Sequence, residues 1–214
     1  PVGRINLLVK SAILHDIGAL KLQQLPDAED LDDGTKEVVK KNTQETLARY
    51  GDLDEEVLRL IAQMQELYTR ESDAEIPAGL KESVNANILY VADAYDRMTA
   101  MKSFEEPTSE VKAVRELLAD EERYNKKIVN ALIHGISILY PGVCVELSNG
   151  EKGLVITENE DNIFEPTVLD FRNNNLYDLS DPSVKQTIEI ADVMKTMDNR
   201  IKLDKSLLEE YQAN

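Results

Sequence analysis

The residue types most suited to chemistry begin with an adjacent pair, His15-Asp16, inside the aliphatic run from Ala12 to Leu20. Successive residues of a helix point about 100° apart, so an imidazole nitrogen and the neighbouring carboxylate can both approach one divalent cation. Gly18 follows the pair and favours an end to the helix. The pattern therefore predicts a metal-binding position at the end of a buried helix.

The histidine count limits the kind of site. The chain contains only His15 and His134, and His134 follows an apolar stripe with no acidic or cysteine neighbour at ligand spacing. A site that needs a cluster of imidazoles is therefore excluded. For His15-Asp16, the sequence leaves open a residual metal site and a hydrogen-bonded polar pair, because one partner satisfies a buried imidazole.

Composition excludes several classes of function. The 214 residues carry 41 acidic and 24 basic side chains, a formal charge of −17. A surface this acidic repels phosphate backbones and anionic lipids, so we expect neither nucleic-acid nor membrane binding. No apolar run approaches the roughly 20 residues that span a bilayer. The single cysteine, Cys144, cannot form an internal disulfide, which favours the cytoplasm.

Helical spacing dominates the first two-thirds of the chain. On the first helix, Ile5, Leu8, Ala12 and Ile13 share one apolar face that leads to His15-Asp16. Asp52 or Asp54 is expected to cap a helix with the stripe Val57, Leu60, Ile61 and Met64, and Thr108 or Ser109 to cap a later one. The predicted helices span residues 36–50, 54–66, 83–102, 108–119 and 123–139, with stripes at 88, 91, 92 and 95 and at 128, 131, 132, 135 and 136.

Pro141-Gly142 marks a change from helical to strand patterning. Residues 143–148 and 151–157 flank Asn149-Gly150, which predicts a β-hairpin. Further strands are expected at 167–171 and 175–179, residues 185–194 are ambiguous, and residues 205–211 are expected to be helical. The predicted fold class is mainly α, with a helical domain over 1–140 and a small antiparallel β appendage with a C-terminal helix over 141–214.

Four segments, in order, resemble one family. LLVKSAILHDIGAL at 7–20 resembles the metal-binding helix of HD-superfamily phosphohydrolases, whose fold is a helical bundle. IPAGLK at 76–81 and ILYVADAYDRMTAMKSFEE at 88–106 resemble the HD-GYP branch, which hydrolyses the bacterial messenger cyclic di-GMP. The segment from 132 to 159 resembles the β extension of that branch. Because the chain starts at Pro1, close to a helix, we expect a fragment whose upstream part is missing.

The resemblance implies roles for three residues. His15 and Asp16 match the family's paired metal ligands, and Asp93 matches the aspartate on the later helix. In that family the carboxylate at the Asp16 position bridges two metal ions, and a metal-bound hydroxide attacks phosphorus. By itself, Asp93 also fits a partly exposed helical acid, like Asp96 nearby.

Other positions depart from the family pattern. The remaining three residues could hold one hard cation (Fe, Mn or Mg) weakly, or none, and cannot hold a cluster of two or three metals. Lys102 keeps a weak ligand-binding charge, whereas Glu105 would repel phosphate. The departures are Ala19 for a lysine, Asn42 for a histidine, Leu67 and Tyr68 for consecutive histidines, Glu75-Ile76-Pro77 for Gly-Tyr-Pro, and Lys102 and Glu105 for arginines.

Two functions follow from this reduced site. The first is a degenerate HD-GYP-type domain of bacterial signalling, catalytically impaired, that acts as a regulatory or interaction module with a protein partner or an upstream sensor or receiver domain. The alternative is a metal-dependent phosphohydrolase that retains a site at His15, Asp16 and Asp93. A receptor for cyclic di-GMP is disfavoured, because the ligand is anionic and the arginines are lost. A homodimer is left open.

Overall fold

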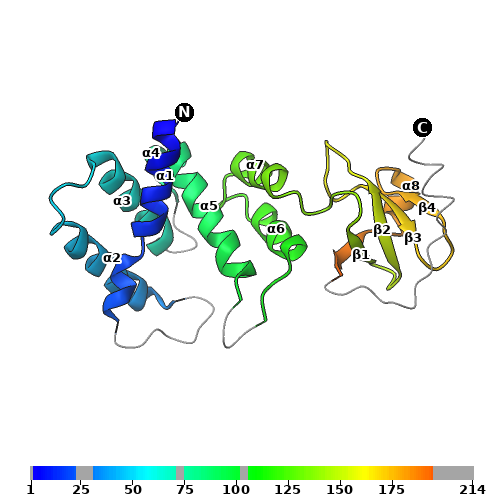
Figure 1. Ribbon diagram of the computed structural model, residues 1–214, viewed down its shortest axis with the longest axis horizontal. Coiled ribbons are helices and arrows are strands. Elements are labelled where there is room, and N and C mark those ends of the chain that lie inside the picture. Colours follow the sequence, from blue (N-terminus) through cyan, green and yellow to red (C-terminus); the bar gives the residue numbers. More distant parts are fainter. Residues whose placement is uncertain (1, 23–30, 71–74, 102–105, 195–214) are drawn as a thin grey trace. The chain divides into compact units, whose positions relative to one another are not determined.

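The computed structural model describes residues 2–22, 31–70, 75–101 and 106–194. Within these ranges helices come first and strands follow (Figure 1), which confirms the predicted fold class of a helical domain followed by a small antiparallel β appendage. The elements are α1 (Val2–Leu14), η1 (Ile17–Lys21), α2 (Asp33–Leu47), α3 (Glu55–Thr69), α4 (Ala78–Lys81), α5 (Val84–Thr99), α6 (Glu110–Ala119), α7 (Lys126–Ile136), β1 (Cys144–Leu147), β2 (Lys152–Thr157), β3 (Thr167–Asp170), β4 (Leu176–Asp178), α8 (Pro182–Lys185) and β5 (Ile190–Val193).

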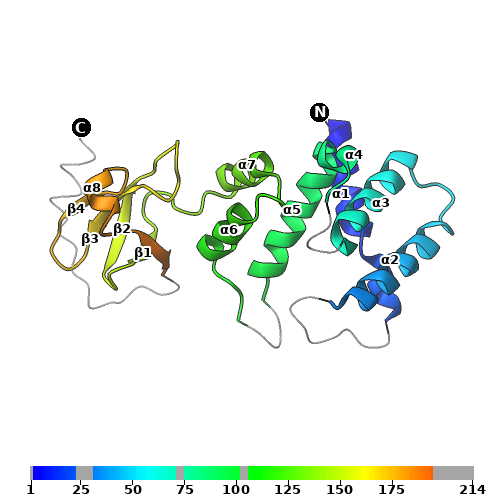
Figure 2. The ribbon, with the colours of Figure 1, turned by 180° about the vertical axis from the view of Figure 1, so that it is seen from behind.

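The chain divides into two compact units. The first comprises residues 1–108 and 116–131, and the second comprises residues 109–115 and 132–214. The boundary therefore passes within α6 and α7, so each of these helices contributes residues to both units. Figure 2 shows the same helices and strands from behind.

Local capping explains where two helices of the first unit begin. Of the two capping candidates for α3, Asp54 takes the role, because its Oδ1 accepts a hydrogen bond from the backbone N–H of Glu56 at 2.9 Å. Asp32 accepts in the same way from the backbone N–H of Thr35 at 3.0 Å and starts α2, three residues earlier than predicted. These caps satisfy donors that an isolated helix end leaves open.

The core of the first unit confirms the stripe predicted on α3, since Val57, Leu60, Ile61 and Met64 are all buried. On α5 the prediction is partly wrong. Ala92 is exposed, and the buried face is formed by Ala86, Tyr90, Val91 and Ala94. The stacked rings of Tyr90 and Tyr124, with centroids 5.4 Å apart, contribute to this difference, because Tyr90 must face the segment that holds Tyr124.

Two other predicted stripes are also revised. On α7, Val129 and Ile133 are buried, whereas Ala131 and Gly135 of the predicted stripe are exposed. On α1 the face that was predicted to lead into the core points mainly outward. Ile5, Ala12 and Ile13 are exposed, and Leu8 is half-buried. The face that packs inward carries Leu7, Ser11 and Leu14, so the apolar pattern of α1 did not reveal which side meets the core.

The second unit contains a five-stranded antiparallel sheet in the order β4-β3-β2-β1-β5. The predicted hairpin is confirmed: Cys144 pairs with Leu154 and Glu146 with Lys152. Gly150, with a φ of +80°, provides the left-handed residue of its turn. The edge strand β5 resolves the ambiguous segment 185–194, because Val145 of β1 pairs with Val193. The second unit also includes the first residues of α6, of which Val111 and Val114 are buried.

Some predictions lie outside the described residues. These are the ligand-binding role of Lys102, the anion repulsion of Glu105, and the helix at 205–211. Among the helices that the structure does describe, none has the length and apolar composition needed to cross a membrane.

Candidate functional site

A cavity of about 350 Å³ in the first unit brings the three predicted site residues to one place. His15 and Asp16 follow α1, and Asp93 comes from α5. The remaining residues that line this site cavity are supplied by α1, η1, α2, α3, α5 and the segment before α2; they are Ala12, Ala19, Leu31, Lys36, Val39, Lys40, Met64, Gln65, Tyr68, Thr69, Asp96 and Arg97.

Gly18 positions the His-Asp pair by allowing η1 to lie directly against α2. Its backbone N–H donates to Oγ1 of Thr43 at 3.0 Å. A Cβ at this position would lie 2.3 Å from the carbonyl oxygen of Val39, closer than any normal contact. The side-chain amide of Asn42 also reaches the Gly18 carbonyl, at 3.4 Å. Asn42 therefore helps to hold the backbone of η1.

The two nitrogens of the His15 ring have different partners. Nδ1 lies 2.7 Å from the carbonyl oxygen of Ala12, and because a carbonyl only accepts, Nδ1 carries a proton. Nε2 lies 3.4 Å from Oδ1 of Asp93. The amide of Gln65 donates to the His15 carbonyl at 2.9 Å and ties this backbone to α3. The ring is thus oriented with Nε2 toward Asp93.

The surroundings of His15 change its pKa in opposing ways. Burial disfavours the charged imidazolium, but the hydrogen bonds with Asp93 and the Ala12 carbonyl and the charges of Asp16 and Asp93 outweigh it. The pKa of His15 is therefore raised from its ordinary value of 6.5. A protonated Nε2 donates to Asp93 and cannot ligate a metal.

The cations Lys36, Lys40 and Arg97 line the site cavity, and Arg97 pairs with Asp93. Nη2 of Arg97 lies 2.9 Å from Oδ2 of Asp93, one helical turn away on α5. The guanidinium carbon of Arg97 also lies 4.4 Å from the centroid of the Tyr68 ring, and Nζ of Lys36 lies 5.3 Å from it. Lys40 reaches the same cavity and donates to Oγ1 of Thr69 at 3.1 Å.

Asp16 lies near Nδ1 of the His15 imidazole, whereas Asp93 lies near Nε2. Its Oδ1 lies 3.9 Å from Nδ1 of His15, and its side chain is 63% exposed, against 18% for Asp93. A metal ion binds in the plane of the ring along one nitrogen lone pair. An ion at Nε2 could therefore share Asp93, but reaching Asp16 would require that side chain to turn.

The donors present do not fit a two-metal centre of the kind that HD phosphohydrolases imply. Only His15 and Asp93 converge, and two metal ions need about twice as many protein ligands as the three candidates provide. Across the described residues, no group of three His, Cys, Asp or Glu side chains is arranged to hold a metal ion. Metal binding by His15, Asp16 and Asp93 stays a prediction.

Sequence reasoning overlooked the cations and the aromatic ring of the cavity. Lys36, Lys40 and Arg97 line the cavity, but the sequence pattern assigned none of them to the site. The spacing of four residues between Asp93 and Arg97 is a helical ion-pair signal that could have been found. The approach of Lys36 to Tyr68 could not, because it depends on how α2 packs against α3, which no local pattern specifies.

Fold and site together define a helical domain in which a His-Asp pair meets an aspartate from a later helix. Residues 3–98 match the family model of the HD domain, and this range contains all three residues. The match shows that residues 3–98, within the helical region, are similar to the HD domain. Comparisons with curated proteins and with solved structures found no match.

Proposed function

We propose that the helical region is a degenerate, catalytically impaired HD domain of the HD-GYP branch that serves cytoplasmic bacterial signalling as a regulatory or interaction module. The observation that carries this proposal is the ion pair between Arg97 and Asp93. A guanidinium at one carboxylate oxygen and the His15 ring at the other occupy both atoms through which Asp93 would bind a metal. The chain thus supplies its own cation.

The positions of the missing family ligands support the same proposal. Asn42 binds the Gly18 backbone, Leu67 is buried in the core, and the Tyr68 ring lies against two cationic side chains. Each of these residues has a packing or hydrogen-bonding role, and none supplies the imidazole of the family pattern. Loss of one catalytic ligand commonly lowers a rate by orders of magnitude, and several losses together leave little activity.

The test is metal content together with hydrolysis. Protein purified without chelators, under reducing and anaerobic conditions, should hold well below one Fe, Mn or Mg per chain. With added Mn²⁺ or Fe²⁺, we expect no hydrolysis of cyclic di-GMP beyond the level of an Asp16→Ala control. Turnover that disappears in Asp16→Ala, or stoichiometric metal that disappears in His15→Ala, would refute the proposal.

One observation favours the alternative, a metal-dependent phosphohydrolase of altered specificity. The contact between Nδ1 of His15 and the Ala12 carbonyl is the outer contact that metal-bound histidines commonly make, and it leaves the Nε2 lone pair toward Asp93 in the neutral ring. A screen of phosphomonoesters and phosphodiesters with Mn²⁺ distinguishes the two proposals. Only the alternative expects turnover that depends on His15.

A further inference from the structure

The charged side chains that line the site cavity differ in exposure according to their sign. The side chains of Lys36 and Lys40 are 12% and 26% exposed. The side chain of Asp16, by contrast, is 63% exposed, and Asp96 is also exposed. The third acid of the lining, Asp93, is paired with a guanidinium. The less exposed part of the lining therefore carries an excess of positive charge.

The acids that lie near these two lysines pair with them only weakly. Nζ of Lys36 lies 3.6 Å from Oδ1 of Asp33, whose side chain is 84% exposed. Nζ of Lys40 lies 3.3 Å from Oε1 of Glu37, which is also exposed. Ion pairs with exposed carboxylates contribute little, because water screens them. In a chain with a net charge of −17, two poorly exposed ammonium groups in one cavity indicate a site for an anion.

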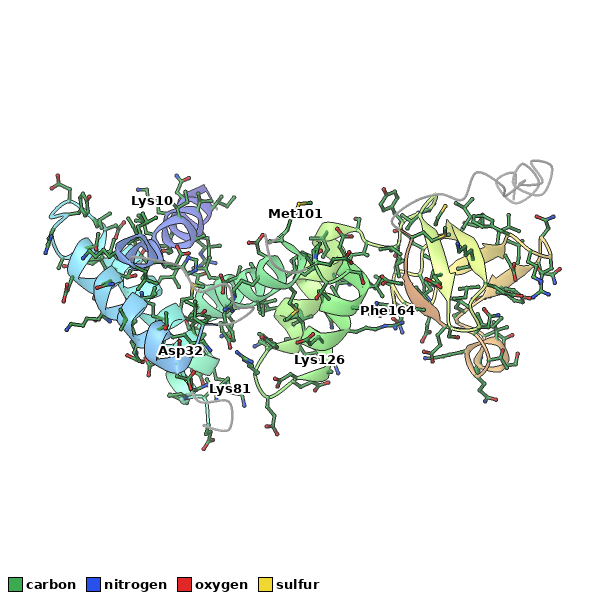
Figure 3. All side chains as sticks on the ribbon, turned by 90° about the horizontal axis from the view of Figure 1, so that it is seen from below. Lys10, Asp32, Lys81, Met101, Lys126 and Phe164 are labelled. Atoms are coloured by element: carbon green, nitrogen blue, oxygen red, sulfur yellow. The ribbon has the colours of Figure 1, made fainter. Side chains whose placement is uncertain are left out.

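Both lysines come from α2, and they are four residues apart. Residues at this spacing lie on the same face of a helix, so the two ammonium groups can approach one anionic group together. Figure 3 shows the helices with their side chains and labels Asp32, the residue immediately before α2. Lys40 donates to Oγ1 of Thr69, and Nζ of Lys36 lies beside the Tyr68 ring. These contacts with α3 hold both lysine side chains at the cavity.

The acids of the cavity limit the charge of the anion. Asp16 and Asp96 repel any negative ligand, and they repel a doubly charged ligand about twice as strongly as a singly charged one. A phosphate monoester carries about 1.5 to 2 negative charges near neutral pH, whereas a carboxylate carries one. Phosphate is also favoured by a guanidinium fork, but Arg97 is already bound to Asp93. A single carboxylate therefore suits the cavity better than a phosphate.

Few neutral side chains of the cavity are available to recognise a sugar or a nucleobase. The amide of Gln65 donates to the His15 carbonyl, and Oγ1 of Thr69 donates to the Gln65 carbonyl at 2.9 Å. The buried Oε1 of Gln65 has no donor among the described residues. One open acceptor cannot satisfy the several donors and acceptors of such ligands, and leaving those groups unpaired would weaken binding.

The apolar residues of the lining indicate the body of the ligand. They are Ala12, Ala19, Leu31, Val39 and Met64. A short hydrocarbon chain or ring would gain free energy by covering them. The cavity volume of about 350 Å³ is near the lower end of the roughly 300–1,000 Å³ range of ligand pockets, which favours a small ligand.

We propose that the site cavity binds a small monocarboxylate with an apolar body, and that the carboxylate lies against Lys36 and Lys40 without a metal ion. This inference rests on the proposed function, because it names the ligand chemistry that would regulate a module without catalysis. The apolar body would pack on Val39 and Met64, which line the same cavity.

The test uses hexanoate as the probe, together with three six-carbon compounds that differ from it in the head group. Hexan-1-ol is neutral, hexylamine is cationic, and hexyl phosphate is the more highly charged anion. In NMR titrations of the full chain, hexanoate should bind with a Kd of about 1 mM or below. Each of the other three compounds should bind about tenfold more weakly, because none can form the same ion pairs at the same charge.

Two substitutions test the lysines. Lys36→Met and Lys40→Met keep an apolar side chain and remove the ammonium group, so each should weaken hexanoate binding about tenfold. Lys41→Met is the matched control, because Lys41 is an exposed lysine of the same helix outside the cavity lining, and it should leave binding unchanged. Circular dichroism confirms that each variant is folded, and if one of the two is not, the other carries the test.

Hexanoate binding should also be unchanged by EDTA, since no metal ion holds the carboxylate. Binding that EDTA abolishes would overturn the proposal, and so would hexyl phosphate that binds as tightly as hexanoate. The proposal would equally be overturned by hexanoate affinity that is unchanged in a folded lysine variant, or by a lack of detectable hexanoate binding.

Failure of this inference is distinguishable from failure of the proposed function. Hexanoate binding that persists in EDTA, together with Mn²⁺-dependent turnover that Asp16→Ala abolishes, would keep the carboxylate site and refute catalytic impairment. Absence of both binding and turnover would remove the carboxylate site and leave the impaired domain.

Discussion

Arg97 lies one helical turn after Asp93 on α5, and its Nη2 is 2.9 Å from Oδ2 of that carboxylate. On the other side, Nε2 of His15 lies 3.4 Å from Oδ1. The carboxylate that would complete a metal site is therefore held between two groups that can each carry positive charge. A metal ion could bind Asp93 only by competing with Arg97 and His15 for the two oxygens of its carboxylate.

Replacing Arg97 should strengthen metal binding. Arg97→Met keeps much of the packing volume but removes the guanidinium from Asp93, so we expect the affinity for Mn²⁺, measured by titration calorimetry, to rise about tenfold. The matched control is Arg59→Met, which removes an exposed arginine 3.8 Å from Glu56, away from the cavity. Unchanged Mn²⁺ affinity in Arg97→Met would show that the guanidinium does not compete with the ion.

The stability that His15 contributes should depend on pH. Its folded pKa is raised above the unfolded value of 6.5, so its ionic contribution is fully present below pH 6.5 and is lost as the pH rises through the folded pKa. The difference in unfolding free energy between the wild type and His15→Gln should therefore shrink with increasing pH. Urea unfolding over this range measures it.

The pKa of His15 can also be measured directly. The chain has two histidines, so a His134→Gln variant assigns the remaining ring signal in an NMR titration to His15. Asp93→Asn should lower the pKa of His15, because the hydrogen bond with that carboxylate is the strongest of the contacts that raise it. A His15 pKa at or below 6.5 in the wild type would contradict this account of the site.

Gly18→Ala should destabilise the first unit. The added methyl group would lie 2.3 Å from the Val39 carbonyl oxygen and 2.4 Å from the Thr43 nitrogen, and backbone atoms cannot move aside cheaply. We expect a loss of about 3 kcal/mol in thermal or urea unfolding, at the upper range for overpacked positions. Gly3→Ala is the control, because nothing lies within 4 Å of its added Cβ and alanine favours the helix over glycine, so no loss is expected there.

Asp170→Asn should stabilise the second unit near neutral pH. Asp170 is fully buried, its Oδ2 has no hydrogen-bond donor among the described residues, and burial together with Glu151 raises its pKa. Wild-type stability should therefore fall as the pH rises from 3.8 through that raised pKa. An asparagine amide can donate to Glu151 without charge, so we expect a gain of about 1 kcal/mol.

The exposed Asp161 provides the matched control for this substitution. Asp161→Asn should change the unfolding free energy by less than about 0.5 kcal/mol, as surface substitutions usually do. Chemical denaturation at pH 5 and pH 8 measures both variants. If Asp170→Asn destabilised the protein at pH 8, the carboxylate would be making a favourable interaction that its buried, donor-free oxygen does not explain.

Structural elements that depend only on residues close together in the sequence could be predicted. The α3 stripe and the Asn149-Gly150 hairpin depend on spacings of a few residues, so the pattern of Val57, Leu60, Ile61 and Met64 was enough to identify a buried helix face. The strand β5 was not predictable, because its identity depends on pairing with β1, more than 40 residues earlier. Short segments such as Ile190–Val193 acquire their structure from that partner.

The sequence by itself determined that the chain has a helical region followed by an antiparallel β appendage, and that His15, Asp16 and Asp93 are its candidate site residues. Only the tertiary structure decided which side of α1 faces the core and which ring nitrogen of His15 meets which carboxylate. The physical reason is that both faces of α1 are apolar, so periodicity cannot rank them. The His15–Asp93 contact likewise depends on how α1 and α5 pack, which no local pattern specifies.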